Sequence, residues 1–448
     1  MPASAAEAFA WHARDGAFER LAPPWNAPVL DSASTRPERG RRVELQVSVA
    51  PGIRVRWISE FTDVHEGESF KDVQLTGPFD AFEHTHAFVA INDDASVMED
   101  RIHFAVPGGA FGDRVVGSYA ERELGRIFRY RHRVLSKDLT VHRRARGRRL
   151  KVLVTGSTGL VGRALVVFLR SGGHEVLRLV RGAARRSDEI AFDPARGAAH
   201  PSELEGFDAV IHLAGEPIAE GRWNAEKKQG IRDSRVTLTR RLSETLAALK
   251  RPPAVFISAS AIGYYGDRGD RILRESDAAG EGFLPQTCVE WEGATEAAAH
   301  AGIRVAHLRT GLVLTPAGGA LQPMLAPFRA GVGGPLGTGN QWWSFITLDD
   351  LLYLIHHIVV NERVRGAVNA ASPEAVTNAE FTRVLGRVLH RPAVFPVPGF
   401  ALRLALGEMA DPLVLASARV NPEKALDTGF EFAYPKLDQA LGHVLGLP

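Results

Sequence analysis

The chain of 448 residues contains a single cysteine, Cys288, so an internal disulfide is excluded. It has no run of about 18 apolar residues, the length that a membrane-spanning helix needs. Neither sign of charge predominates, because the formal net charge is only +2, so no overall field favours a nucleic acid or a membrane surface. The first residues also lack the basic-then-apolar order of a secretory signal. We therefore expect a cytoplasmic protein with small-molecule rather than nucleic-acid partners.

The chain is too long for one ordinary domain, and its pattern changes near residue 150. Before that point, five runs have the apolar character of strands, and several alternate apolar and polar residues as half-buried antiparallel strands do. A helix is expected to follow over residues 124–139. We predict an α+β domain over residues 1–142. The strand-like runs are 43–49, 53–61, 70–75, 84–91 and 96–106.

Residues 143–149 contain five arginines in seven positions. This Arg-rich run stands between two differently patterned regions, so we interpret it as a solvated linker. A nucleic-acid patch would need more length and interleaved aromatic residues.

The first region resembles the START-like (polyketide cyclase and ligand-transport) helix-grip family. The resemblance implies a curved sheet around a long helix, with an apolar cavity that could hold a lipid or an aromatic ligand. Five segments carry it: Phe-Ala-Trp-His at 9–12, Leu-Ala-Pro-Pro-Trp at 21–25, Gly-Pro-Phe at 77–79 with Glu-His-Thr-His at 83–86, and Arg-Ile-His-Phe-Ala-Val-Pro at 101–107.

His84 and His86 flank Thr85 and therefore point to the same face of an expected strand. A metal site would want a third ligand, for which His103 is a candidate. We favour hydrogen-bonded histidines instead, because no acidic or cysteine partner stands at a recognisable spacing. The sequence therefore predicts no metal.

The strongest motif of the chain is the glycine turn at residues 151–162, Lys-Val-Leu-Val-Thr-Gly-Ser-Thr-Gly-Leu-Val-Gly. A short β-branched run ends at Thr155, glycines follow at 156, 159 and 162, and an apolar helix-like run comes next. In this context the first glycine permits the tight turn, the second lets the backbone approach a pyrophosphate, and the third lets the helix pack closely. The helix N-terminus then offers free N–H groups to the phosphates. We predict nucleotide binding at Gly156, Ser157, Thr158, Gly159, Leu160 and Val161.

From residue 150 onward, strand-like and helix-like runs alternate, which is typical of a parallel, doubly wound sheet. We predict a Rossmann-like α/β domain over residues 150–390 and a small helical module over 391–448. The expected strands are 151–155, 175–180, 208–213, 254–259 and 304–309, and the expected helices are 161–171, 224–249 and 285–301.

The second expected strand of this region ends in Arg181, where an NAD-preferring site usually places an acidic residue for the ribose 2′-hydroxyl. Arg185 and Arg186 follow. Guanidinium groups bind phosphate oxygens in pairs, so this end of the strand favours the 2′-phosphate of NADP over NAD. The alternative is that Arg185 and Arg186 belong to an exposed loop.

The same region resembles the extended short-chain dehydrogenase/reductase superfamily, which includes the nucleotide-sugar epimerases and dehydratases. A narrower resemblance is to the atypical "epimerase family protein" subgroup with its C-terminal module. The superfamily motifs are the glycine turn, 212–215, 258–260 with 265–266, 309–313 and 346–350; the subgroup motifs are 213–217, 222–224, 291–292, 333–341, Trp343, 398–404, 407–408, 419–422 and 429–430. The resemblance implies cofactor contacts at Leu213, Ala214, Gly215, Arg235 and Val313, and it raises a homodimer as an expectation.

The superfamily normally uses Ser/Thr, Tyr and Lys, with the Lys four residues after the Tyr. Ser260 fits the serine position, but Cys288-Val-Glu-Trp-Glu292 stands where Tyr-x-x-x-Lys is expected, and no tyrosine lies between Tyr265 and Tyr353. Three hypotheses follow. The chain is an oxidoreductase or epimerase in which Tyr264 or Tyr265 is the acid, it binds NADP as a sensor without turnover, or it carries an apolar ligand in the first domain. We interpret Cys288 as core packing rather than a nucleophile.

Overall fold

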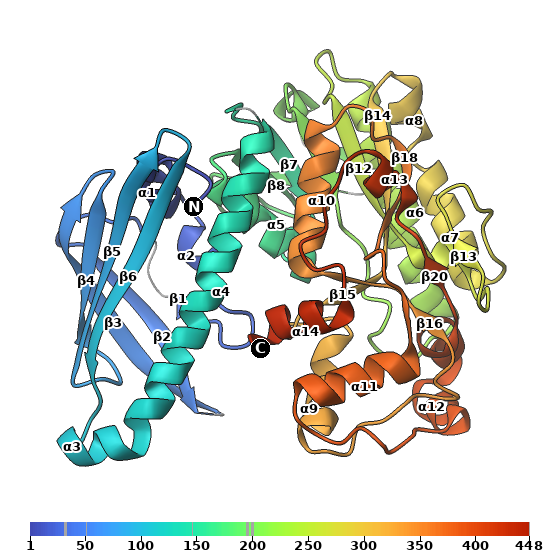
Figure 1. The fold of residues 1–448 in the computed structure, drawn as a ribbon. Helices are drawn as coiled ribbons and strands as arrows, with labels where there is room; N and C mark the ends of the chain where they lie inside the picture. Colours follow the sequence, from blue (N-terminus) through green and yellow to red (C-terminus); the bar gives the residue numbers. More distant parts are fainter. Residues whose placement is uncertain (31–33, 51, 146, 194–196, 199–200, 448) are drawn as a thin grey trace. The chain divides into compact units, whose positions relative to one another are not determined.

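The computed structural model describes residues 1–30, 34–50, 52–145, 147–193, 197–198 and 201–447. The chain divides into two compact units. The first consists of Met1–Arg149 with Val166–His174, and the second of Leu150–Leu165 with Glu175–Pro448. Figure 1 shows the elements of both.

The first unit is built on a six-stranded antiparallel sheet with the strand order β1-β2-β3-β4-β5-β6. All five strand-like runs of the sequence are confirmed as strands. The sheet is thus a simple meander, in which each strand pairs with its neighbour along the chain. Its strands are β1 (Val29–Leu30), β2 (Arg42–Ala50), β3 (Ile53–His65), β4 (Ser69–Thr76), β5 (Ala81–Asn92) and β6 (Ala95–Ala105).

Three helices complete the core of this unit: α1 (Ala5–His12), α2 (Ala17–Leu21) and the long α4 (Ser118–His142). A short helix α3 (Gly109–Gly112) and a π-helical turn at Asp113–Gly117 lead into α4. The buried stripe of α4, including Val134, Leu135 and Leu139, packs into the same cluster as aromatic residues of α1 and the sheet. The first unit is therefore a β-rich sheet with helices packed on it, whereas its assignment to the START-like family stays a prediction.

The Arg-rich run continues α4 as a 3-10 turn at Arg143–Ala145. Arg143 donates to the backbone oxygen of Pro2 at 2.9 Å and forms an ion pair with Asp94 at 2.5 Å. Position 146 lies outside the described residues. This part of the run is thus helical and bonded to its own unit, which differs from the solvated linker that its charge predicted.

The second unit contains an eight-stranded sheet with the order β10-β9-β8-β7-β11-β12-β14-β18. Seven strands are parallel, and only β10 at the edge runs antiparallel. The Rossmann-like prediction is confirmed, with three strands that the sequence pattern did not reveal: β9, β10 and β18. The strands are β7 (Lys151–Thr155), β8 (Glu175–Arg181), β9 (Glu189–Asp193), β10 (Gly197–Ala198), β11 (Ala209–His212), β12 (Val255–Ala261), β14 (Arg304–Thr310) and β18 (Gly366–Ala370).

The expected helices are present, with one difference. The run predicted as one helix over 285–301 is two, α7 (Phe283–Gly293) and α8 (Glu296–His300). The break falls at Thr295, whose hydroxyl donates to the backbone oxygen of Glu292 at 2.7 Å. The other helices along the sheet are α5 (Leu160–Ser171), α6 (Ala225–Ala247) and α10 (Leu348–Val360). Among the described residues, no helix combines the length and the apolar character that crossing a bilayer requires.

The C-terminal region packs into the second unit instead of forming a core of its own. One hydrophobic cluster runs from Leu314 and Phe345 through Phe381 to Leu441 and Leu445. The boundary at residue 390 therefore divides a continuous core. The elements here are α9 (Leu321–Arg329), α11 (Asn378–Val388), α12 (Gly399–Leu406), α13 (Glu423–Asp427) and α14 (Leu437–Leu445), with the two-stranded ladders β13 (Ile272–Leu273) with β20 (Arg419–Val420), β15 (Leu312–Leu314) with β17 (Phe345–Thr347), and β16 (Trp342–Trp343) with β19 (Val376–Thr377).

Candidate functional site

The glycine turn joins β7 to α5 with the geometry that its spacing predicted. Gly156 has a φ of +65°, and a Cβ there would lie 2.7 Å from backbone atoms of Leu213 and Ala214. A Cβ on Gly162 would lie 2.2 Å from the carbonyl oxygen of Gly156. Both positions therefore need glycine, the first for its conformation and the second for the close approach of helix and turn.

Three features of the turn fit the pyrophosphate of a dinucleotide. The backbone around Gly156 has no room for a side chain, and α5 begins at Leu160 with its free N–H groups just after the turn. The hydroxyl of Ser157 is buried and has no hydrogen-bond partner among the described residues. A buried hydroxyl without a partner is costly, so a phosphate oxygen at this position would satisfy it.

The loop after β11 is tied to the turn by buried hydrogen bonds. Thr155 Oγ1 lies 2.7 Å from His212 Nδ1 and accepts from the backbone N–H of Ala214 at 3.3 Å. The other ring nitrogen of His212 lies 2.9 Å from Thr239 Oγ1. Burial lowers the pKa of His212 to about 4, so this imidazole is neutral and its role is to hold the two strand ends together.

Positively charged groups gather at the same edge of the sheet. Arg181 is exposed and is the last residue of β8, which pairs in parallel with β7. The guanidinium of Arg235 on α6 stands next to Gly215, since a Cβ there would lie 3.3 Å from its Cζ, and it covers the ring of Trp291 at 5.1 Å. The hydrogen bond from Lys227, and then the charges of Lys227, Arg181 and Arg235, lower the pKa of Glu216.

Arg185 and Arg186 lie in an exposed turn that is held by Glu189. Both are exposed and both donate their backbone N–H groups to Glu189 Oε2, at 2.8 and 3.2 Å. They therefore belong to the exposed turn between β8 and β9, as the alternative interpretation held. Val313, the remaining predicted contact, is half-buried on β15, where it pairs with Ile346.

A charged network lies at the carboxyl ends of β12 and β14, where Ser260 and Arg309 are paired in register. Ser260 Oγ donates to Glu292 Oε1 at 2.7 Å. Arg309 grips the same carboxylate with two nitrogens, Nε to Oε1 and Nη2 to Oε2, each at 2.8 Å. Burial acts to raise the pKa of Glu292, but its bonds to Arg309 outweigh burial and hold that pKa below its ordinary value. The carboxylate is therefore ionised at neutral pH, and the Ser260 hydroxyl donates its one hydrogen bond to it.

The two candidate tyrosines occupy different environments. Tyr265 is fully buried, donates its hydroxyl to Asn369 Oδ1 at 2.7 Å and accepts from Arg309 Nη1 at 3.0 Å. Burial raises its pKa to about 12. Tyr264 is half-buried, and the Arg309 guanidinium lies 3.4 Å from the centroid of its ring. Within the described residues no hydrogen bond engages the Tyr264 hydroxyl, so it is the more available proton donor.

Cys288 lies on the inner side of α7, with its Sγ 3.9 Å from the backbone oxygen of Ala261. The side chain is buried, and burial raises the pKa of the thiol to about 11. Because the thiolate is the nucleophile, burial and the raised pKa disfavour reaction at Cys288, and its buried position agrees with its interpretation as core packing. Its neighbour Trp291 donates to Thr239 Oγ1 at 2.9 Å and so fixes α7 to α6.

Sequence reasoning missed the part that Glu292 plays. It stands four residues after Cys288, in the position where the superfamily usually has its lysine. The structure instead places its carboxylate between Ser260 and Arg309. The sequence could have suggested this ion pair. An acidic residue on that helix and an arginine at the end of the next strand are oppositely charged groups, and the sequence offers neither another evident partner.

The comparisons with known proteins agree with this geometry. The family model described as NAD dependent epimerase/dehydratase family matches residues 152–371, and a domain of unknown function, DUF1731, matches residues 397–444. The chain is 43% identical to the epimerase family protein Mb2239 of Mycobacterium bovis over 297 residues, which are 66% of this chain and 98% of that protein. It is 32% identical to the human epimerase family protein SDR39U1 over 302 residues, 66% of this chain and 100% of that protein.

Two solved structures are similar as well. A nucleoside-diphosphate sugar epimerase from Corynebacterium glutamicum superimposes with a TM-score of 0.80 and 33% identity, covering 100% of this chain and 89% of that one. The human epimerase family protein SDR39U1 (isoform 2), solved with NADPH, gives a TM-score of 0.62 and 31% identity, covering 66% of this chain and 99% of that one. The similarity to the first structure thus extends over both units of the chain.

Proposed function

The chain belongs to the NAD dependent epimerase/dehydratase family, and from that premise we propose that it is an NADP-dependent oxidoreductase or epimerase-like enzyme that acts on a small molecule. The observation that carries the proposal is the position of Ser260. Its hydroxyl stands at the carboxyl end of a central strand of the parallel sheet, the edge at which open α/β sheets bind their ligands.

The proposed cofactor site takes the pyrophosphate on residues 156–161, with the buried Ser157 hydroxyl as a donor. Leu213, Ala214 and Gly215 line its nucleoside side. Arg181 and Arg235 supply positive charge that suits a 2′-phosphate, in keeping with the NADPH with which the human relative was solved. When bound, NADP accepts or donates a hydride.

The remaining steps belong to residues of the chain. The Ser260 hydroxyl donates its one hydrogen bond to Glu292, so the lone pairs of its oxygen remain available. With them Ser260 can accept a hydrogen bond from a substrate hydroxyl and so orient the substrate. Arg309 holds Glu292 in place and lies over Tyr264. We assign proton transfer to the Tyr264 hydroxyl rather than to Tyr265, because Tyr265 is sealed between Asn369 and Arg309 and its pKa is about 12.

The test measures NADPH binding and turnover separately. Protein fluorescence gives the affinity for NADPH, and the absorbance of NADPH follows its oxidation across a panel of carbonyl compounds and sugar nucleotides. We expect Tyr264→Phe to lower turnover by at least 100-fold, the usual contribution of an acid–base group, and Ser260→Ala to lower turnover through the loss of substrate orientation. In both variants the affinity for NADPH should stay within threefold. Tyr265→Phe is the matched control, because it removes the neighbouring tyrosine hydroxyl, which is buried and bonded to Asn369 and Arg309. Equal losses in Tyr264→Phe and Tyr265→Phe would contradict the assignment.

A second candidate, an NADP sensor without turnover, rests on one observation: the positions of the usual Tyr and Lys hold a buried thiol and a salt-bridged carboxylate. It predicts tight NADPH binding with no oxidation by any carbonyl of the panel, in the wild type and in all variants alike.

The START-like resemblance of the first unit adds a proposed apolar ligand, which could be the substrate itself. Its support is the aromatic content of that unit's core, where Phe9 packs against Phe70 and Phe88 with ring centroids 5.9 and 5.8 Å apart. Mass spectrometry of lipids extracted from the purified chain tests this carrier role, and the same experiment narrows the choice of substrate. Homodimerisation stays a prediction from the resemblance, to be checked by light scattering.

A further inference from the structure

The first unit contains a cluster of imidazoles and carboxylates that the proposed function does not use. Asp72 lies on β4, His84 and His86 on β5 and Asp100 on β6. The strand register pairs Asp72 with His84 and His86 with Asp100, so all four side chains stand on one face of the sheet. Cross-strand pairing thus supplies the acidic partners that no local spacing in the sequence revealed.

We propose that Asp72, His84 and His86 form a binding site for a divalent transition-metal ion of the imidazole-preferring kind, such as Zn²⁺. One ligand atom from each of the three lies within 4.8 Å of the others. His84 Nδ1 is 3.5 Å from Asp72 Oδ1, which is longer than an ordinary N–H···O hydrogen bond. Two ligand atoms held about 2.1 Å from one tetrahedral ion lie about 3.4 Å apart, so this separation matches one edge of such a site.

Asp100 provides the outer support that metal-binding histidines require. Its Oδ1 accepts from His84 Nε2 at 3.1 Å, on the opposite side of the ring from Asp72, and it lies 2.6 Å from His86 Nδ1. A carboxylate that holds the far nitrogen of a ligating histidine fixes the ring and raises its basicity. Asp100 is itself almost fully buried and is also bonded by His132 of α4, so its position is determined by three imidazoles.

His12 of α1 gives a second, independent sign of a missing partner. Its Nδ1 donates to the backbone oxygen of Ala8 at 2.8 Å, so its Nε2 carries the lone pair. That Nε2 is buried and unpartnered within the described residues, and its ring lies 5.5 Å from the ring of His86. His12 is 8% exposed, so water does not readily satisfy it. It is therefore an acceptor beside the cluster, outside the three residues whose ligand atoms lie within 4.8 Å of one another.

The charges around the cluster also suit a cation. Asp72 and Asp100 bring two carboxylates, and Arg131 of α4, which interacts with both, brings one positive charge. The carboxylates of the cluster therefore outnumber its one arginine.

The structure also corrects the ligand that the sequence suggested. His103 is exposed on β6 and pairs with Glu83, so it lies on the opposite face from His84 and His86. It provides a matched control, because it is a histidine of the same strand pair that cannot reach the cluster.

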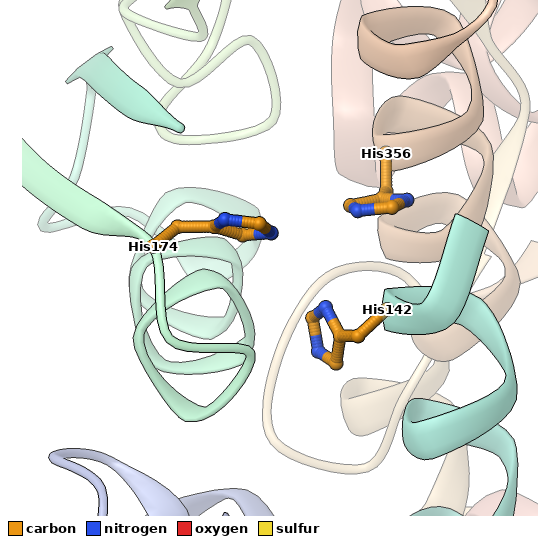
Figure 2. A group of neighbouring side chains, drawn as sticks. All are labelled: His142, His174 and His356. Carbon is orange, nitrogen blue, oxygen red and sulfur yellow. The ribbon is translucent and has the colours of Figure 1, made fainter. Parts of the chain in front are cut away.

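The first unit contains another pair of neighbouring imidazoles, which could also bind a metal ion, so the test must tell it apart from the proposed site. His142, at the end of α4, and His174 have rings in T-shaped contact with centroids 5.7 Å apart (Figure 2). His356, labelled in the same view, belongs to α10 of the second unit.

The experiment titrates the full-length chain, stripped with a chelator, with Co²⁺ and then Zn²⁺. We expect one equivalent of Co²⁺ to produce the visible absorption of a tetrahedral ion, and Zn²⁺ to displace it. Asp72→Asn and His84→Gln should weaken Zn²⁺ binding by at least tenfold, whereas His103→Ala and His174→Ala should change it by less than twofold. NADPH affinity and circular dichroism check that each variant is folded.

Three results of the titration would overturn the proposed site. The first is that the wild type binds no ion, and the second is that Asp72→Asn and His84→Gln bind the ion as tightly as the wild type. The third is that His174→Ala loses binding. Anomalous scattering at the zinc edge from wild-type crystals decides the matter without any variant, because it locates the ion, and a peak away from His84 and His86 contradicts the proposal.

Discussion

Replacing Glu292 by Gln should destabilise the second unit strongly, because it leaves a charge without its partner. The Arg309 side chain is 4% exposed and that of Glu292 12%, so both ends of the pair are out of water. Removing one partner of a buried pair typically costs about 3–5 kcal/mol. Glutamine keeps an acceptor for Ser260, and Arg309 keeps its bonds to Tyr265 and to the backbone of Glu275, so we expect the lower end, about 3 kcal/mol.

Thermal unfolding measures this loss. A unit of about 290 residues unfolds with an entropy of about 0.6 kcal/mol per kelvin, so a loss of about 3 kcal/mol lowers Tm by about 5 °C. Glu290→Gln is the matched control, since Glu290 lies on the same helix and pairs with Arg232, which is half exposed. An exposed pair contributes about 0–1 kcal/mol, so this control should lose less than about 2 °C.

The difference between wild type and Glu292→Gln should also depend on pH. The pKa of Glu292 is lowered in the folded chain, so its ionised form contributes stability that is fully present above the unfolded pKa of about 4.3. That stability is lost as the pH falls through the lower, folded pKa. The gap in Tm is therefore complete at pH 7 and shrinks below about pH 4. A Tm loss no larger than that of Glu290→Gln, or a gap that grows in acid, would refute the reasoning.

Three further predictions use other parts of the second unit. Arg181→Ala should weaken NADPH binding about 10- to 100-fold and leave NADH binding unchanged, with Arg186→Ala as the control, and an equal loss for both cofactors would contradict a 2′-phosphate contact. Gly162→Ala should abolish NADPH binding, because its Cβ would lie 2.2 Å from the Gly156 oxygen, whereas Gly230→Ala, with open space around it on α6, should raise stability by about 1 kcal/mol in urea titrations. Cys288, with its pKa of about 11, should react with iodoacetamide at pH 7 at least 100-fold more slowly in the folded chain than in denaturant, and rapid native labelling followed by mass spectrometry would show that it is accessible.

The residues that the sequence located best are those whose function depends on neighbours along the chain. The glycine turn is one example, because its requirements for a positive φ at Gly156 and a close approach at Gly162 are local and are written in a spacing of three. The meander of the first unit is another, since each strand pairs with the next one and alternation alone predicts it. β9 and β18 have only five residues each, too few to show a period, and unlike the equally short β7 neither is followed by a motif such as the glycine turn.

The pairing of residues far apart in the chain needed the tertiary structure. Glu292 meets Ser260 and Arg309 only because two parallel strands and a crossover helix bring their ends together, over separations of 32 and 17 residues. The carboxylates beside His84 and His86 are 12 and 14 residues away from them on neighbouring strands, set by the register of the sheet. The sequence by itself therefore determined the nucleotide turn and the absence of the usual Tyr-x-x-x-Lys. Only the packing of the tertiary structure decided what replaces that motif, which is the Glu292–Arg309 salt bridge with Ser260 hydrogen-bonded to it. The physical reason is that a buried charge is stable only next to a partner, however far apart the two residues lie along the chain.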